Sequence, residues 1–403
     1  MSSSTPLPPP ELAAARATAT TIALLSLAAF FSGAAIRLCD GLIPRLGADF
    51  GITPGRAGAV VITFSVVYGV MQLVFGPVGD RWGKARVVCI AVFASGITAW
   101  ASALAPDFDS LLWLRGAWGA AAAGVIPLTI AWIGDHVPLE QRQSVLARLL
   151  LWILTGMMAG QLGGGLFADL EVGWRGAFLL AGACYLLVAA LLFAKLRSGF
   201  SPPTPGPAPA LLAQLGSVLA RRWSWWVLAA ALAEGVFLLG TLTYLPTYLH
   251  LRFALTLSTA SALVALYAAG GVLYALMAPM LVRRLGQTRM VRLGGMFMGL
   301  GFLAWLLSPT PWSAGPVALL VGFGTYLFHN TLQTHATQMA PAVRGSAVSL
   351  FAFCLFFGQA IGTALAGLAT DYVGSGLPLA AAALALPAAA WSFARALGRK
   401  PAE

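Results

Sequence analysis

Charge is what this chain has least of. Only 9% of its 403 residues are Asp, Glu, Lys or Arg, whereas soluble domains carry about 25%. So few charges could not cover a water-facing surface for a protein of this length, which excludes an ordinary soluble protein. Apolar residues make up 59% of the chain, and the mean hydropathy is +0.84.

Residues that bind metals or act as nucleophiles are also few. The four cysteines are far apart in the sequence: Cys39, Cys89, Cys184 and Cys354. They lack metal-ligand spacing, so we interpret them as helix-packing residues. The histidines are not spaced to form a metal site either, and Gly83-Lys84 lacks the preceding glycine of a phosphate loop. We expect no metal, no cofactor, no ATP hydrolysis and no enzymatic activity.

Apolar runs of about 20 residues recur along the chain, and each is long enough to cross about 30 Å of hydrocarbon. Because backbone polar groups must be satisfied within such a segment, we predict that the runs are helices. About twelve spans are expected: 19–44, 57–76, 87–106, 109–134, 144–168, 175–195, 224–248, 257–281, 289–308, 314–338, 346–368 and 375–396.

The basic residues are distributed unevenly between the two sides of these spans. With the N-terminus inside, 18 of the 24 Lys and Arg fall on one side and four on the other, while Arg37 and Arg115 fall within spans. This positive-inside pattern predicts that both termini are cytoplasmic. The net charge of +11 is therefore interpreted as a match to anionic lipid head groups, and no nucleic-acid partner is expected.

A long polar interruption divides the spans six and six. It runs from Lys195 to Arg222 and is rich in proline, which favours an extended tether. The expected organisation is a tail (1–18), a six-helix bundle (19–196), a cytoplasmic linker (197–222), a second bundle (223–397) and a short tail (398–403). The fold class is thus an all-α integral membrane protein with two pseudo-symmetric bundles around a central cavity.

Short sequence echoes at half the chain length indicate a duplication. The charged turn around Arg81 returns around Arg284, an offset of 203 residues. The segment 165–169 (GLFAD) returns as 367–371 (GLATD) at an offset of 202, and Gly160-Gln161 returns as Gly358-Gln359. A duplicated helical bundle in a membrane is typical of secondary transporters.

Three motifs resemble those of the major facilitator superfamily. The loop 79–86 (GDRWGKAR) is similar to the signature loop between helices 2 and 3, and 114–119 (LRGAWG) to the helix-4 motif with its intramembrane Arg. The stretch 156–164 (GMMAGQLGG) resembles the helix-5 antiporter motif but has Gln161 where that motif carries Pro. The resemblance covers essentially the whole chain and implies a transporter.

The resemblance also implies that the first loop latches the two halves at the cytoplasmic face. The latch residues would be Gly79, Asp80, Arg81, Gly83 and Arg86. Asp80 would meet the N-terminal end of the helix expected over 346–368, whose dipole attracts negative charge. Arg283 occupies the position of Asp80 in the second loop, so the latch should be asymmetric.

Two acidic residues fall inside predicted spans, Asp40 and Glu234. A carboxylate is costly in a bilayer and typically marks a proton or substrate path. Glu234 lies about 18 Å into its helix at 1.5 Å per residue, near the midplane. Asp40 either forms a local ion pair with Arg37 or acts in coupling, and Arg115 lies at a similar depth and could pair with it. Both carboxylates are candidate proton sites, and both arginines are candidate substrate-binding residues.

A polar stripe runs along the span 314–338. Its members are spaced so that they share one helix face: Tyr326, His329, Asn330, Gln333 and Thr337. The stripe favours substrate contact over interhelical hydrogen bonding alone, whereas His335 lies off it and is interpreted as packing. A second group consists of small residues suited to close helix packing or hinging: Gly156, Gly160, Gly163, Gly164, Gly358 and Gly362.

Together these features predict a monomeric, proton-coupled exporter of a small drug or metabolite in a bacterial inner membrane. An importer that carries a sugar, amino acid or organic acid with protons is the alternative within transport. A non-transporting membrane scaffold or enzyme is the alternative of another class. The sequence does not identify the substrate.

Overall fold

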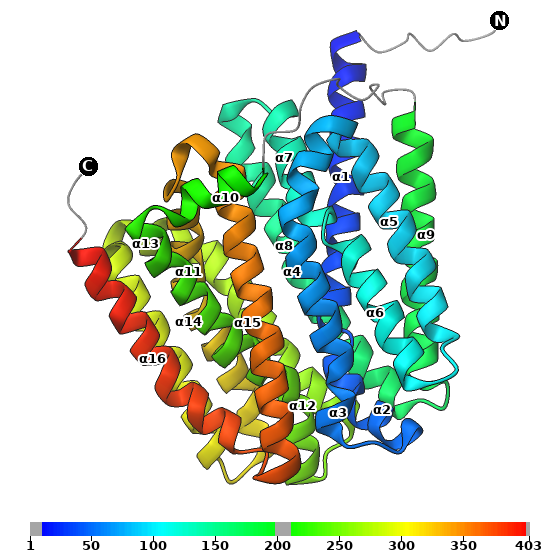
Figure 1. The fold of residues 1–403 in the computed structure, drawn as a ribbon, viewed down its shortest axis with the longest axis vertical. Coiled ribbons are helices and arrows are strands. Elements are labelled where there is room, and N and C mark those ends of the chain that lie inside the picture. Colours follow the sequence, from blue (N-terminus) through cyan, green and yellow to red (C-terminus); the bar gives the residue numbers. More distant parts are fainter. Residues whose placement is uncertain (1–9, 198–210, 400–403) are drawn as a thin grey trace, which may run out of the picture.

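The computed structural model describes residues 10–197 and 211–399, and these residues form helices joined by short turns, without strands (Figure 1). The helices of the N-terminal part are α1 (Pro10–Arg37), η1 (Asp40–Leu42), α2 (Ile43–Phe50), α3 (Pro54–Ala57), α4 (Ala59–Trp82), α5 (Lys84–Ala103), α6 (Phe108–Ala122), α7 (Val125–His136), α8 (Leu139–Asp169) and α9 (Gly173–Leu196). Those of the C-terminal part are α10 (Leu211–Leu219), α11 (Arg222–Ala233), η3 (Glu234–Leu239), α12 (Gly240–Phe253), α13 (Leu257–Leu307), η4 (Pro311–Ser313), α14 (Ala314–Gln338), η5 (Pro341–Val343), α15 (Arg344–Tyr372) and α16 (Leu377–Gly398).

Ten helical segments of the described residues are long and apolar enough to cross a membrane. One of them, α13, is 51 residues long and bends at Gly286, whose φ of 67° is not helical. The two spans expected over 257–281 and 289–308 are therefore one bent element here. Helix α14 has 25 residues but is not among the ten, and it carries the polar stripe.

The structure differs from the sequence expectations at two boundaries. Helix α1 begins at Pro10, so the predicted N-terminal tail 1–18 is partly helical. Residues 211–219 of the predicted extended linker form the helix α10, because the proline-rich composition ends before Leu211. The remainder of the proline-rich stretch, residues 198–210, lies outside the described residues, as do 1–9 and 400–403.

The bundle has two distinguishable ends (Figure 1). We call the end where α9 finishes and α10 begins the linker end, and the opposite end, where α2, α3 and the end of α12 lie, the far end. Figure 1 shows α1–α9 on one side of the molecule and α10–α16 on the other. The two sides meet chiefly where α8 packs on α13 and where α15 packs on α4.

Small residues bring helices together in the same way on both sides. A Cβ added to Gly156 or Gly160 of α8 would lie 2.0 or 2.1 Å from a backbone oxygen of α1. A Cβ added to Gly358 or Gly362 of α15 would lie 2.4 or 2.0 Å from a backbone oxygen of the α11–η3 segment. Gly156 and Gly358 are 202 residues apart, as are Gly160 and Gly362, so these helix crossings are equivalent at the offset of the echoed segments 165–169 and 367–371. Gly163 differs, since its added Cβ would find only Leu38 Cδ1, at 3.9 Å.

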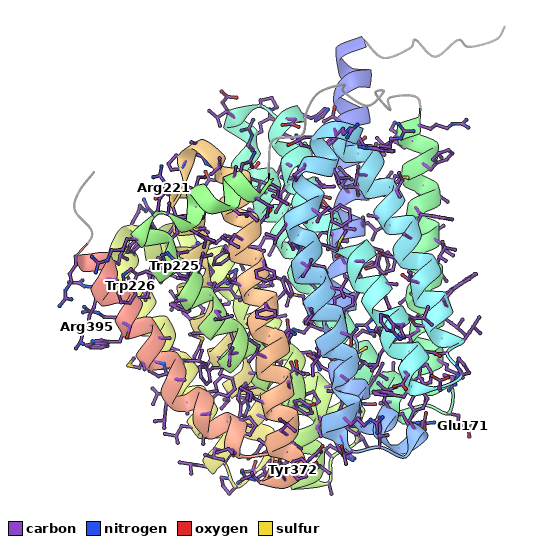
Figure 2. The ribbon with its side chains drawn as sticks, in the orientation of Figure 1. Glu171, Arg221, Trp225, Trp226, Tyr372 and Arg395 are labelled. Atoms are coloured by element: carbon purple, nitrogen blue, oxygen red, sulfur yellow. The ribbon has the colours of Figure 1, made fainter. Side chains whose placement is uncertain are left out.

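Exposed tryptophans lie beside basic residues toward the linker end. Figure 2 shows Arg221, Trp225, Trp226 and Arg395 on this part of the surface, and Glu171 and Tyr372 at the far end. Trp225 is 58% exposed and donates its indole N–H to the Leu219 carbonyl, at 2.9 Å. Tryptophan is enriched where a membrane meets water, and cytoplasmic loops are enriched in Lys and Arg. This surface fits such a boundary.

Candidate functional site

Glu234 and His329 form a partly buried contact between two helices. Glu234 is 1% exposed and opens the π-helical turn η3, which interrupts the α11–α12 segment. The Nδ1 atom of His329 on α14 lies 3.0 Å from both Oε1 and Oε2 of Glu234. Single π-helical turns inside α-helices occur frequently at functional sites. Sequence reasoning placed the two residues separately, and the structure brings them together.

The polar stripe of α14 lies on the more accessible face of that helix. All five stripe residues are partly or fully accessible, whereas the adjacent Leu327, Phe328, Thr331 and Leu332 are buried. Gln333 is exposed, and the other four are partly accessible. His335, off the stripe, is buried with its Nε2 3.1 Å from the Gln287 side-chain oxygen, which fits the packing role expected for it.

Asn330 connects this stripe to a cavity that opens at the linker end. The cavity has a volume of about 590 Å³ and is lined by residues of α8, α13 and α14: Gln143, Ala278, Pro279, Val282, Arg283 and Asn330. Asn330 donates its side-chain N–H to the Tyr274 hydroxyl, at 2.7 Å, and the Tyr274 ring stacks on Tyr326 with centroids 6.3 Å apart. Tyr274 was not singled out in the sequence, because one tyrosine in an apolar span carries no periodic signal.

Arg37 and Asp40 form a second buried charge pair. Arg37 Nη1 lies 3.1 Å from Asp40 Oδ2, and both side chains are almost inaccessible. Asp40 Oδ1 has no hydrogen-bond partner among the described residues. Arg37 also lines a small pocket of about 10 Å³ beside Gln161 and Tyr267, which has room for roughly one water.

Arg115 does not make the contact with Asp40 that its depth suggested. Its guanidinium lies 4.4 Å from the Phe64 ring centroid and 4.7 Å from that of Trp118, and its Nε donates to the Val60 carbonyl at 3.5 Å. Among the described residues no carboxylate forms an ion pair with it. Aromatic faces can stabilise a desolvated cation, and Asp40 is already held by Arg37 one turn away.

The signature loop does not hold the two sides together in this conformation. The Asp80 side chain is 71% exposed and lies 3.4 Å from Lys84 Nζ, and Lys84 also pairs with Asp135 at 2.5 Å. Among the described residues Asp80 pairs with Lys84, and the expected contact with the start of α15 is not made. Gly83, with a φ of 85°, turns the chain between α4 and α5, a conformation that favours glycine. Gly79 packs closely on Leu128, and Arg81 is exposed.

These contacts give the site a defined chemistry. Each of the two buried carboxylates lies beside a single nitrogen-bearing partner, and imidazole can gain or lose a proton near neutral pH. No group of three or more His, Cys, Asp or Glu that could hold a metal occurs in the described part of the chain. The site can therefore hold protons and hydrogen-bond a ligand in the neighbouring cavity.

Comparison with known proteins identifies the family of this chain. The family model of the Major Facilitator Superfamily matches residues 25–363. The chain is 23% identical over 342 residues to the uncharacterized MFS-type transporter YceJ of Bacillus subtilis, covering 84% of this chain and 86% of the relative. It is 26% identical over 413 residues to the gallate transporter of Pseudomonas putida, covering 93% and 90%. It is 28% identical over 177 residues to the multi-drug resistance efflux pump PmrA of Streptococcus pneumoniae, covering 43% and 44%.

Solved structures agree with the fold. The nucleoside transporter NupG superposes with a TM-score of 0.70 at 15% identity, covering 94% of this chain and 98% of that one. A bacterial homologue of the human lysosomal transporter Spinster superposes with a TM-score of 0.68 at 18% identity, covering 95% of each chain. The family model and the relatives matched over most of this chain carry the functional class. This chain is therefore a multi-pass membrane transporter without enzymatic function, and it belongs to the major facilitator superfamily.

Proposed function

We propose that this protein is a proton-coupled secondary transporter that exports a small molecule by alternating access. The observation that carries the proposal is the contact between His329 Nδ1 and the Glu234 carboxylate, at 3.0 Å to both oxygens. A buried carboxylate paired with an imidazole can take up one proton without leaving an uncompensated charge. His329 lies on the polar stripe of α14, next to Asn330, which lines the cavity. Proton binding by the pair and ligand binding in the cavity can therefore influence one another.

Proton uptake would act on the packing between η3 and α14. With Glu234 ionised and His329 protonated, the pair is a charge-assisted hydrogen bond. A second proton, taken up by the Glu234 carboxylate, removes the attraction between opposite charges. A weaker hydrogen bond between the protonated imidazole and a neutral carboxyl group remains. The conformer that best accommodates the second proton then gains population. Asp40, with its unpartnered Oδ1, is proposed as a second proton site.

The substrate would enter from the linker end and contact the α14 stripe. The cavity of about 590 Å³ reaches Asn330, and we include Tyr326, His329 and Gln333 in the binding surface. Tyr274 is added because it orients the Asn330 amide. One matched relative is a multi-drug resistance efflux pump, which supports export. When the linker end closes, Asp80 would reach the start of α15 and hold that end shut.

The proposed arrangement is twelve membrane crossings in two six-helix bundles. It counts the two arms of α13 as separate crossings at the Gly286 bend and includes α14. The matched relatives are bacterial, which supports a bacterial inner membrane, and the distribution of basic residues supports a cytoplasmic location for the linker end and both termini. We further propose that the protein works as a monomer, with protons, small-molecule substrate and membrane lipids as its partners.

The decisive experiment replaces Glu234 with glutamine. Glu234→Gln keeps the shape of the protonated carboxyl, so the fold should survive while proton-driven currents on solid-supported membranes disappear across a pH series. Glu140→Gln, an exposed carboxyl at the start of α8, is the matched control and should behave as wild type. Wild-type currents with the same pH profile in Glu234→Gln would place the coupling site elsewhere.

An importer of an organic acid is the second candidate. Arg37 lies at the junction of the two sides, where its pocket is also lined by Leu242 and Val264, and a guanidinium suits a carboxylate ligand. A relative matched over 93% of this chain is a gallate transporter. Counterflow of labelled aromatic acids in proteoliposomes distinguishes the candidates, because an importer of this class exchanges them and an exporter of unrelated compounds does not.

A further inference from the structure

Two aspartates at the far end join the two sides of the molecule. Asp169 is the last residue of α8, and Asp371 is the penultimate residue of α15. They are 202 residues apart and end the echoed segments 165–169 and 367–371. Neither was assigned a role from the sequence.

Asp169 is bonded to the first residues of α13. Its Oδ2 accepts from the Ser258 backbone N–H at 2.7 Å and from the Ser258 hydroxyl at 2.5 Å. Its Oδ1 accepts from the Leu257 N–H at 3.2 Å. The first N–H groups of a helix lack partners within the helix, so a carboxylate from the other side of the molecule supplies acceptors that the helix needs.

Asp371 makes the equivalent contact from the α10–α16 side to the α1–α9 side of the molecule. Its Oδ1 accepts from the Gly55 N–H at 2.9 Å and its Oδ2 from the Thr53 hydroxyl at 2.6 Å, at the turn that leads through α3 into α4. Tyr244 of α12 donates to the Gly55 carbonyl at 3.1 Å. A Cβ on Gly55 would lie 2.2 Å from Asp371 Oδ2, so only glycine allows the approach.

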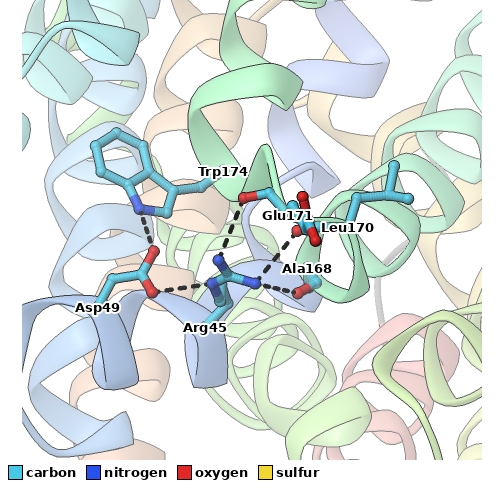
Figure 3. A network of polar contacts seen from close by, with 6 residues as sticks. All are labelled: Arg45, Asp49, Ala168, Leu170, Glu171 and Trp174. Carbon is cyan, nitrogen blue, oxygen red and sulfur yellow. Dashed lines mark hydrogen bonds and ion pairs between the residues drawn. The ribbon is translucent and has the colours of Figure 1, made fainter.

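Arg45 is hydrogen-bonded to backbone carbonyls at the end of α8 (Figure 3). It donates to the carbonyls of Ala168 and Leu170, both at 3.2 Å, which flank Asp169 in the chain. Asp49 accepts from Arg45 Nε at 2.9 Å and from the Trp174 indole N–H at 3.0 Å. These hydrogen bonds fix the end of α8 and so the position of the Asp169 carboxylate.

We propose that Asp169 and Asp371 are a pair of latches that close the far end while the linker end is open. Alternating access requires the two sides to separate at the far end, and both sets of hydrogen bonds must then be exchanged for water. Because water can replace them, each latch biases the equilibrium without preventing opening. The inference rests on the proposed alternating access and is independent of proton coupling.

The test measures far-end distances directly. Spin labels on Val172 and Leu377, which are 60% and 49% exposed and lie on opposite sides, report opening by pulsed electron resonance in nanodiscs. We expect the distance between the two labels to be mainly short in wild type. Asp169→Asn or Asp371→Asn should raise the population with a long distance several-fold, and the double variant should raise it further. Asparagine removes the negative charge. It also replaces one accepting oxygen by an NH₂ group, which cannot accept hydrogen bonds from the N–H groups of the opposite helix start.

Asp107→Asn is the matched control. Asp107 accepts from the Ser110 N–H at 2.8 Å within one side of the molecule, and this hydrogen bond lowers the pKa of its carboxyl. The substitution alters the same chemistry without crossing the junction, so distances should stay as in wild type. If the Asp variants do not fold, Ser258→Ala with Thr53→Val removes the hydroxyl donors and should shift the distances in the same direction.

An unchanged distance distribution in a folded double variant overturns the proposal. So does an equal shift in Asp107→Asn, which would indicate general loosening of the far end. The measurement uses neither a proton gradient nor substrate. If Glu234→Gln keeps wild-type currents, the far-end distances can still be interpreted. If the far-end distances do not change, the proposal of proton coupling is unaffected.

Discussion

His329 supplies a hydrogen bond that Glu234 could not find on its own helix. The Nδ1 atom is equidistant from both carboxylate oxygens, and the ring packs against Phe351 with centroids 5.7 Å apart. An imidazole in this position both stabilises the ionised carboxylate and can receive a proton itself. The proposed proton site is therefore better described as the pair than as either residue alone.

Replacing His329 with glutamine tests that description. Glutamine retains a donor for Glu234 but cannot carry a proton, so we expect proton-driven transport to fall about tenfold or more, which corresponds to about 1.4 kcal/mol. Binding measured without a pH gradient should change less. His136→Gln, on a ring stacked against Trp132 near the end of α7, serves as control. Unchanged pH dependence of transport in His329→Gln would confine the proton site to Glu234.

At the scale of elements, the α1–α8 crossing depends on glycine at particular turns. Gly160 is buried and faces the Ala34 carbonyl, whereas Gly163, on the same helix, has ordinary space around it. The same substitution at the two positions therefore separates close packing from helix propensity. Alanine favours a helix over glycine by roughly 0.5–1 kcal/mol, so only steric conflict can make it unfavourable here.

Gly160→Ala should destabilise the protein by about 1–3 kcal/mol, because the added methyl forces α1 and α8 apart. Gly163→Ala should be neutral or slightly stabilising. Thermal unfolding in detergent, followed by tryptophan fluorescence, compares the two variants with wild type. Equal stability of both variants would mean that α1 shifts at little cost and that Gly160 is not a packing constraint.

At the scale of the whole molecule, the two ends differ in how they are closed. The far end is joined by carboxylate contacts on both sides of the junction, whereas the linker end has an open cavity and an exposed Asp80. The difference is what the proposed alternating access predicts for one of its two states. Its orientation in the cell depends on the membrane topology, which we predict from the distribution of basic residues.

Cysteine labelling can establish that topology. In a background without the four native cysteines, Leu212→Cys on α10 and Asp107→Cys at the far end provide exposed sites at opposite ends. We expect a membrane-impermeant maleimide added to intact cells to label Asp107→Cys strongly and Leu212→Cys only after permeabilisation. The reverse pattern would invert the molecule in the membrane, and with it the direction assigned to the open cavity.

The sequence alone determined the membrane class, the helical architecture and the family, because each depends on local properties. Hydrophobic length, scarcity of charge and short motifs are all present within single segments. The same local information identified Glu234, Asp40 and the α14 stripe, since a buried acid or a polar face is visible in one helix. The Arg37–Asp40 contact could also be anticipated, because the two residues are one turn apart.

Only the tertiary structure decided which of these residues meet. Glu234 and His329 are 95 positions apart, and Asp371 meets Gly55 across 316. Helical periodicity assigns a residue to a face but does not specify which neighbouring helix that face meets or how deeply. For that reason the sequence suggested Asp40 as a possible partner of Arg115, which instead lies against aromatic rings. Asp169 and Asp371 had no assigned partner in the sequence, because the helix starts that they contact are far away in the chain.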